Sequence, residues 1–140
     1  MSNFPFFKQV SIIDCGPACL QMVAKYYGKD HDLAMLSNLA GLSSEGASLH
    51  SISEVAQRIG FNTLSVKITL QEIREQELVP CIAHWRKKHF IVVYKVTEDK
   101  IFVADPAKGL MEYPIDEFIQ KWAILGDEAM RGIALLLELK

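Results

Sequence analysis

The sequence predicts an α+β fold in which a helical N-terminal part packs against a C-terminal antiparallel sheet. Residues 1–60 place apolar side chains at helical spacing, whereas residues 61–140 contain short runs of alternating, β-branched or aromatic residues. The chain has 140 residues, of which 50% are hydrophobic and 23% charged, so it can close one core. We therefore expect a single domain over residues 1–140, with helices over about 1–60 and the sheet over about 61–140.

Three helices are expected in the first part. The first begins at Cys15, after which apolar residues recur three or four positions apart. The second covers residues 33–39 and is followed by a glycine that can end it. The third begins at Ser48 or at Ser51, and Ser51 with Glu54 can form a capping box.

The second part is expected to contain strands joined by short turns. They cover residues 61–68, 80–85, 89–96, 101–105, 110–113 and 132–139. Residues 115–122 form a helical turn or two before the last strand. The polar residues 97–100 separate two strands and predict an antiparallel hairpin.

Charge and composition exclude several classes of function. The 15 Lys and Arg residues against 17 Asp and Glu give a net charge of −2, which argues against a nucleic-acid partner. No apolar run approaches the ~20 residues that a membrane-spanning helix needs, and residues 1–10 lack the pattern of a signal peptide. Three cysteines without a disulfide pattern indicate a reducing, cytoplasmic setting.

Cys15 is the strongest candidate for a reactive side chain. Pro17 is tolerated only in the first turn of a helix, which places Cys15 at a helix N-terminus with Asp14 as a possible N-cap. The positive end of the helix dipole stabilises a thiolate there. Cys19 and Cys81 fit the ordinary role of small buried apolar residues. No Cys or His pair completes a zinc-binding spacing, so neither a metal nor another cofactor is expected.

A nucleophilic cysteine needs a base, and the base needs an orienting group. His31 and His50 fit surface positions, whereas His89 opens an apolar strand at the end of the predicted sheet. Asp105 ends the next strand, and the hairpin places it opposite residue 90, 91 or 92. Only the middle register puts His89 and Asp105 on one face. Taken singly, a strand-end histidine and an Asp-Pro turn have ordinary structural explanations.

Two further residues are candidates by their position. Gln9 lies six residues before Cys15 in an extended segment, and its amide can donate to an oxyanion beside the backbone N–H of Cys15. Trp85 lies close to His89 and is the candidate for the wall of a substrate cleft, although ordinary packing also explains it.

These residues occur in an order that resembles a known family. Gln9, the block Asp14-Cys15-Gly16-x-Ala18-Cys19-Leu20, and His89 and Asp105 sixteen residues apart resemble the double-glycine leader peptidase domain of bacteriocin-processing ABC transporters. The likeness continues through Tyr26-Tyr27-Gly28, Ser48-Leu49, Gly60-Phe61, Pro80, His84-Trp85, Asp105-Pro106, Gly109, Phe118 and Trp122. Each motif alone is weak, but the ordered set is specific and covers nearly the whole chain.

The resemblance implies a papain-like cysteine protease fold and a reaction. Cys15 is then the nucleophile, His89 the general base and acid, Asp105 the residue that orients His89, and Gln9 part of the oxyanion hole. The implied substrate is the precursor of a secreted bacteriocin-type peptide, cut after a Gly-Gly or Gly-Ala pair. Leaders of this family dock as amphipathic helices, so an apolar groove is also expected.

In this family, membrane-spanning and ATPase domains follow the peptidase domain. This sequence has neither a transmembrane run nor a GxxxxGK[ST] motif, so those domains are expected as partners in cis or in trans. The implied location is the cytoplasm, at the inner face of the bacterial plasma membrane if the domain is attached to its transporter. Two alternatives stay open: a non-catalytic module that docks leaders, and another thiol acyl-transfer enzyme on the same fold.

Overall fold

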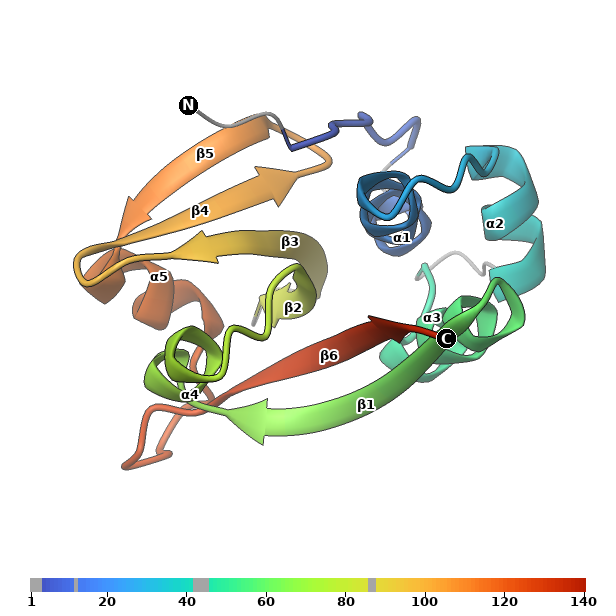
Figure 1. Cartoon of the computed structure of the whole chain (residues 1–140). Coiled ribbons are helices and arrows are strands. Elements are labelled where there is room, and N and C mark those ends of the chain that lie inside the picture. Colours follow the sequence, from blue (N-terminus) through green and yellow to red (C-terminus); the bar gives the residue numbers. More distant parts are fainter. Residues whose placement is uncertain (1–3, 12, 42–45, 86–87) are drawn as a thin grey trace.

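The computed structural model describes residues 4–11, 13–41, 46–85 and 88–140, and the described residues form helices and strands in the predicted α+β arrangement (Figure 1). In chain order these are α1 (Cys15–Tyr26), α2 (Leu33–Ala40), α3 (Leu49–Arg58), β1 (Phe61–Ile68), α4 (Leu70–Glu75), β2 (Cys81–Trp85), β3 (His89–Val96), β4 (Lys100–Asp105), β5 (Gly109–Pro114), α5 (Ile115–Trp122) and β6 (Gly132–Leu139). The sequence predicted each of these elements except α4, with bounds that differ by at most a few residues.

The strands form one antiparallel sheet in the order β1-β6-β2-β3-β4-β5. The last strand of the chain therefore lies between the first two, and β1 and β5 form the two edges of the sheet. In Figure 1, α1, α2 and α3 lie on the right, whereas α4 and α5 lie on the left. The expected separation of helices first and strands afterwards is thus incomplete, because α4 and α5 belong to the second half of the chain.

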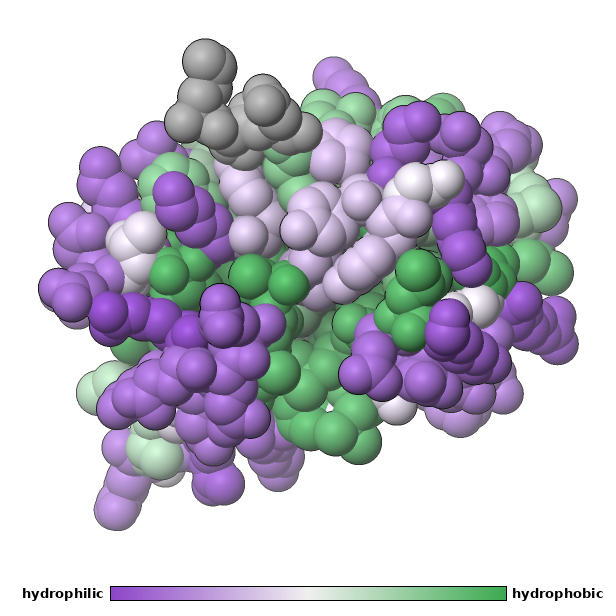
Figure 2. All heavy atoms as spheres, in the orientation of Figure 1, coloured by the Kyte–Doolittle hydropathy of each residue, from purple (hydrophilic) through white to green (hydrophobic). Residues whose placement is uncertain are grey.

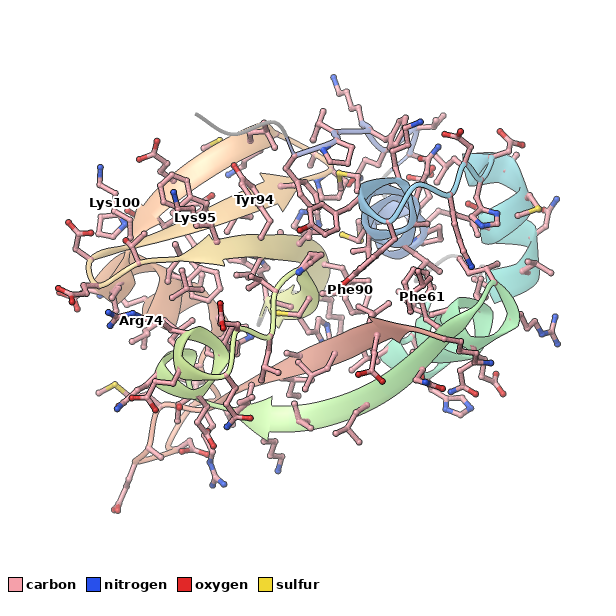
Figure 3. The ribbon with its side chains drawn as sticks, in the orientation of Figure 1. Phe61, Arg74, Phe90, Tyr94, Lys95 and Lys100 are labelled. Carbon is pink, nitrogen blue, oxygen red and sulfur yellow. The ribbon has the colours of Figure 1, made fainter. Side chains whose placement is uncertain are left out.

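The helices cover two apolar clusters, one on each side of the sheet. The first cluster joins α1, α2 and α3 to inward residues such as Phe90 and Leu135, and Figure 3 shows Phe90 between β3 and α1. The second cluster joins α4 and α5 to residues such as Val93 and Trp122. No helix in the described part of the chain is long and apolar enough to cross a membrane.

The start of α1 is packed tightly against α3. A Cβ atom on Gly16 would lie 2.1 Å from Cδ1 of Ile52, which is 1% exposed and has little room to move. Pro17 occupies the first turn, where its missing N–H breaks no helical hydrogen bond. The predicted position of Cys15 at the N-terminus of this helix is confirmed.

The structure selects one of the two starts predicted for α3 and places the capping box at another helix. Ser48, rather than Ser51, is the N-cap of α3, and its side chain accepts a hydrogen bond from the Ser51 N–H. The capping box forms instead at α4, where Thr69 and Glu72 bond each other's backbone N–H groups. Helix α4 was missed because six residues give too short a stretch for helical periodicity to stand out.

The β3–β4 hairpin sets the register that matters for the site. Val96 lies opposite Ile101 and Val92 opposite Ala104, with a bulge between Val93 and Lys95 that accommodates one extra residue. Continued by one step, this pairing places Asp105 opposite residue 91. That is the middle of the three registers allowed by the sequence, and it puts His89 and Asp105 on one face of the sheet.

Candidate active site

His89 and Asp105 form a hydrogen-bonded pair at the end of the sheet. His89 is the first residue of β3 and Asp105 the last of β4, and Nε2 of the ring lies 2.7 Å from Oδ1 of the carboxylate. The Asp105 side chain is 4% exposed and that of His89 is 27% exposed. The other ring nitrogen remains for a second partner.

Cys15 is that second partner. Its thiol hydrogen bonds to the side chain of His89 and is buried at the start of α1, where the first N–H groups of the helix have no intrahelical acceptor. The structure therefore brings together three side chains that lie up to 90 positions apart in the chain. The arrangement suits transfer of a proton between sulfur and an imidazole that a carboxylate holds in place.

The electrostatics of the pair favour a charged imidazole beside a charged carboxylate. Burial alone would lower the pKa of His89, but hydrogen bonds with Asp105 and Cys15 and the charges of both outweigh burial and raise that pKa to about 9. Burial would raise the pKa of Asp105. Its hydrogen bonds with His89 and with the Ala107 N–H, the latter 2.9 Å long, instead lower that pKa.

This pair predicts how stability depends on pH. Because the pKa of His89 is raised, protonated His89 stabilises the fold fully below pH 6.5, the ordinary pKa of histidine. This stabilisation is lost as pH rises through about 9. Because the pKa of Asp105 is lowered, its carboxylate stabilises the fold above its ordinary pKa, and this stabilisation is lost as the carboxylate is protonated at acidic pH.

We therefore expect the melting temperature to fall between pH 6.5 and pH 9.5. The His89→Ala variant should show a flatter pH dependence over this range, because it has no proton to lose there. Thermal denaturation of both proteins in matched buffers is the measurement. An equally steep decline in the variant would show that other groups govern stability at alkaline pH.

The remaining cysteines are placed as expected for structural residues. All three cysteines are free and buried. Burial raises the pKa of Cys19 well above its ordinary value and that of Cys81 to about 12, so both thiols stay protonated and unreactive at neutral pH. Among the described residues, no three His, Cys, Asp or Glu side chains are grouped to hold a metal ion.

A backbone hydrogen bond holds Gln9 beside the end of β4, where Asp105 lies. Its N–H donates to the carbonyl of Pro106, the residue after Asp105, at 2.9 Å. Its side-chain Nε2 donates to the Ser11 carbonyl at 2.8 Å, which leaves a second N–H on the same nitrogen. Oε1 of this amide is buried and has no hydrogen-bond partner.

Asp14 does not cap α1 with its side chain, which corrects the sequence prediction. It occupies the N-cap position, but its carboxylate turns back and accepts hydrogen bonds from the backbone N–H groups of Val10 and Ser11, at 3.2 and 3.0 Å. The carboxylate therefore bonds the preceding segment instead of the first turn of α1. Sequence reasoning saw only the helix and missed this contact.

Trp85 lines a cavity of about 1350 Å³ that begins at His89 and Asp105. Tyr113 and Lys121 lie on its walls, and the Lys121 ammonium lies 5.2 Å from the centre of the Trp85 ring. Trp85 also packs against Phe118, and its Nε1 is buried without a hydrogen-bond partner. The residue thus has both of the roles considered from the sequence: it packs in the core and it borders a cavity.

The other histidines lie outside this group. His50 is on the surface of α3, with Nε2 3.6 Å from Glu54. His84 stacks on Phe90 with ring centres 4.5 Å apart, and burial together with Lys88 lowers its pKa. Neither takes part in the hydrogen bonds of His89 that the structure records.

Comparison with known proteins identifies relatives of this arrangement. The Peptidase C39 family matches residues 3–126. A Lactococcus lactis relative, the lactococcin-G-processing and transport ATP-binding protein LagD, is 36% identical over 114 residues, which cover 78% of this chain and 16% of the relative. The Escherichia coli colicin V secretion/processing ATP-binding protein CvaB is 36% identical over 106 residues, or 76% and 15% of the two chains. This chain thus spans about one sixth of their length.

Two solved structures share the fold over nearly the whole chain. One is a double glycine motif protease from an AMS/PCAT transporter in complex with the leader peptide, with a TM-score of 0.87, 26% identity, and 97% and 91% of the two chains covered. The other is the peptidase domain of Streptococcus ComA, a bifunctional ABC transporter involved in quorum sensing, with a TM-score of 0.87, 26% identity, and 99% and 100% covered. The predicted papain-like fold is confirmed by this likeness.

Proposed function

This chain belongs to the Peptidase C39 family of cysteine peptidases, and we propose that it removes the leader from a secreted, bacteriocin-type peptide precursor by cutting after a Gly-Gly or Gly-Ala pair. The observation that carries this proposal is the hydrogen-bonded series Cys15, His89 and Asp105 at the junction of α1 and the sheet. The processing relatives and the leader-bound protease structure support the choice of substrate.

In the proposed reaction, Cys15 is the nucleophile and attacks the carbonyl carbon of the second glycine. The Gln9 amide and the backbone N–H of Cys15 donate to the oxyanion that forms. His89 carries the proton from the thiol to the leaving amine, so the C–N bond breaks and the released peptide departs. His89 then takes a proton from water, which hydrolyses the thioester, and Asp105 orients the ring throughout.

We propose that residues 1–140 act as one peptidase unit on the cytoplasmic side of the plasma membrane, with transport and ATPase domains as partners in cis or in trans. The three cysteines form no disulfide pattern in the sequence and are free in the structure, which fits a reducing compartment. The supporting relatives are processing and transport ATP-binding proteins. The net charge of −2 argues against nucleic acid as a further partner.

The requirement for two glycines gives the direct test of specificity. Precursors with the Gly-Gly pair intact, changed to Gly-Ala, or with leucine at either position should be incubated with the chain, and the product masses measured. We expect cleavage of the first two only, because a narrow slot rejects larger side chains sterically. Equal cleavage of the leucine precursors would point to a different thiol acyl-transfer enzyme, and binding without cleavage to a docking module.

We further propose that part of the precursor lies in the cavity lined by Trp85, because this cavity is continuous with His89 and Asp105. Leu125 also lines it and is 81% exposed, so a polar replacement there costs little stability. We expect Leu125→Ser to raise KM for a full precursor by about 3- to 10-fold with kcat unchanged, as expected for the loss of one apolar contact.

Leu64→Ser is the matched control for this prediction. Leu64 is 60% exposed on β1, outside the cavity, and lies opposite Leu136. Figure 2 shows that apolar residues also gather on the visible face over β1 and β6. A rise in KM for Leu64→Ser together with no change for Leu125→Ser would show that the precursor binds to this face and not in the cavity.

A further inference from the structure

We propose that Asp14 is a positioning residue that holds residues 4–11, here called the Gln9 segment, beside the nucleophile. This inference rests on the proposed function. The carboxylate of Asp14 accepts hydrogen bonds from two backbone N–H groups of that segment, those of Val10 and Ser11. Asp14 also precedes Cys15 in the chain. One residue therefore links the helix that carries the nucleophile to the segment that carries the proposed oxyanion donor.

The backbone of Asp14 contributes to the same link. Its carbonyl accepts the Ala18 N–H at 3.0 Å, which is the first hydrogen bond of α1, and its own N–H donates to the Ser11 carbonyl at 3.4 Å. The Ser11 carbonyl also accepts Nε2 of Gln9, at 2.8 Å. A shift of Ser11 would therefore move the Gln9 amide directly.

The segment is held at its other contacts as well. The backbone N–H of Gln9 donates to the carbonyl of Pro106, and Phe4 stacks on Tyr94 of β3 with ring centres 4.7 Å apart and planes 8° apart. These contacts tie the segment to the sheet, which holds His89 and Asp105. The segment meets α1, which holds Cys15, at two places: the Asp14 carboxylate next to the nucleophile, and the ring of Phe4, which stacks on Tyr26 at the far end of the helix with ring centres 5.6 Å apart. The proposed oxyanion hole depends on both attachments, because its two donors come from different elements.

The carboxylate form is what this link requires. Both carboxylate oxygens of Asp14 act as acceptors, and the residue is buried, with 6% of its surface exposed. An asparagine has the same size but presents an NH₂ donor in place of one acceptor, so it would oppose one of the two N–H groups.

The test compares two reagents that react with the same sulfur. Iodoacetamide alkylates a thiolate without forming an oxyanion. A peptide nitrile ending in glycyl-aminoacetonitrile forms a thioimidate: a C–S bond is made, the C≡N bond becomes C=N–H, and the thiol proton moves through His89 to nitrogen. That nitrogen lies where the oxyanion would lie, so this adduct reports on the Gln9 segment.

We expect Asp14→Asn to slow nitrile addition, and kcat for a Gly-Gly precursor, by about 10- to 100-fold, the effect of a misplacement near 1 Å. The melting temperature should fall, because one buried N–H loses its acceptor, but alkylation by iodoacetamide and KM should change little at a temperature where the variant is folded. Gln9→Ala should slow nitrile addition similarly, and the double variant should be no slower than Gln9→Ala alone, because both act through one amide. Asp30→Asn, an exposed residue paired with Lys25, is the matched control and should change nothing.

Three results would overturn the inference. The first is an Asp14→Asn variant that adds the nitrile at the wild-type rate. The second is a parallel loss of alkylation, which would mean that the nucleophile itself had been disturbed. The third is a double variant whose losses multiply. If nitrile addition depends on Asp14 but no double-glycine precursor is cleaved, the proposed substrate is wrong and the role of Asp14 stands.

Discussion

Replacing Cys15 by alanine is expected to abolish cleavage, with a fall in kcat of at least ~10⁴-fold, because no other group can supply the acyl-enzyme. The chain should stay folded, since the change removes one sulfur atom at the start of α1. Initial rates of precursor cleavage, followed by mass spectrometry, measure the effect. Iodoacetamide should add one label to the wild-type chain and none to this variant.

Cys19→Ala is the matched control, one helical turn further along α1. Cys19 is fully buried and burial raises the pKa of its thiol, so its loss should cost stability but not chemistry. Cleavage that persists in Cys15→Ala, or that disappears in a folded Cys19→Ala, would contradict the assignment of the nucleophile.

Removing the charge of Asp105 is expected to have the second largest effect and to move the pH profile. In the proposed mechanism, His89 must be protonated to release the leaving amine, and its pKa of about 9 keeps it so up to that pH. Asp105→Asn removes the carboxylate whose hydrogen bond and charge raise this pKa. The alkaline limb of kcat/KM should therefore shift from near pH 9 towards the ordinary histidine value of about 6.5.

His89→Ala supplies the comparison for this variant. It should lose nearly as much activity as Cys15→Ala and keep no alkaline limb, whereas Asp105→Asn should keep measurable activity because neighbouring contacts can still hold the ring. The losses should not multiply in a double variant, since the three residues act as a unit. An Asp105→Asn profile with an unchanged alkaline limb would show that Asp105 does not set the pKa of His89.

The parts of the fold that depend on local pattern were predictable. Pro17 fixed the helix start at Cys15, and the strands 61–68, 89–96 and 132–139 have the predicted bounds. Pairings between distant segments were not predictable in this way. The position of β6 between β1 and β2 depends on how the whole sheet buries its two faces. The β3–β4 register depends on a bulge that no single residue in the sequence predicts.

The site shows the same division. His89 and Asp105 were placed near each other by the hairpin, but only the bulged register puts them on one face and allows the 2.7 Å contact. Asp14 was predicted to serve its own helix and instead bonds the segment before it. The cavity beside Trp85 depends on where α5 packs, which is a tertiary property with no signal in the local sequence.

The most direct test of the proposed function is the mass of the products from a double-glycine precursor incubated with this chain and, separately, with its Cys15→Ala variant. The account predicts two products from the wild-type chain, a leader ending in the second glycine and the released peptide, and none from the variant. An uncut precursor that stays bound to both proteins would contradict cleavage and indicate a leader-docking module. Cleavage at another bond would contradict the proposed specificity.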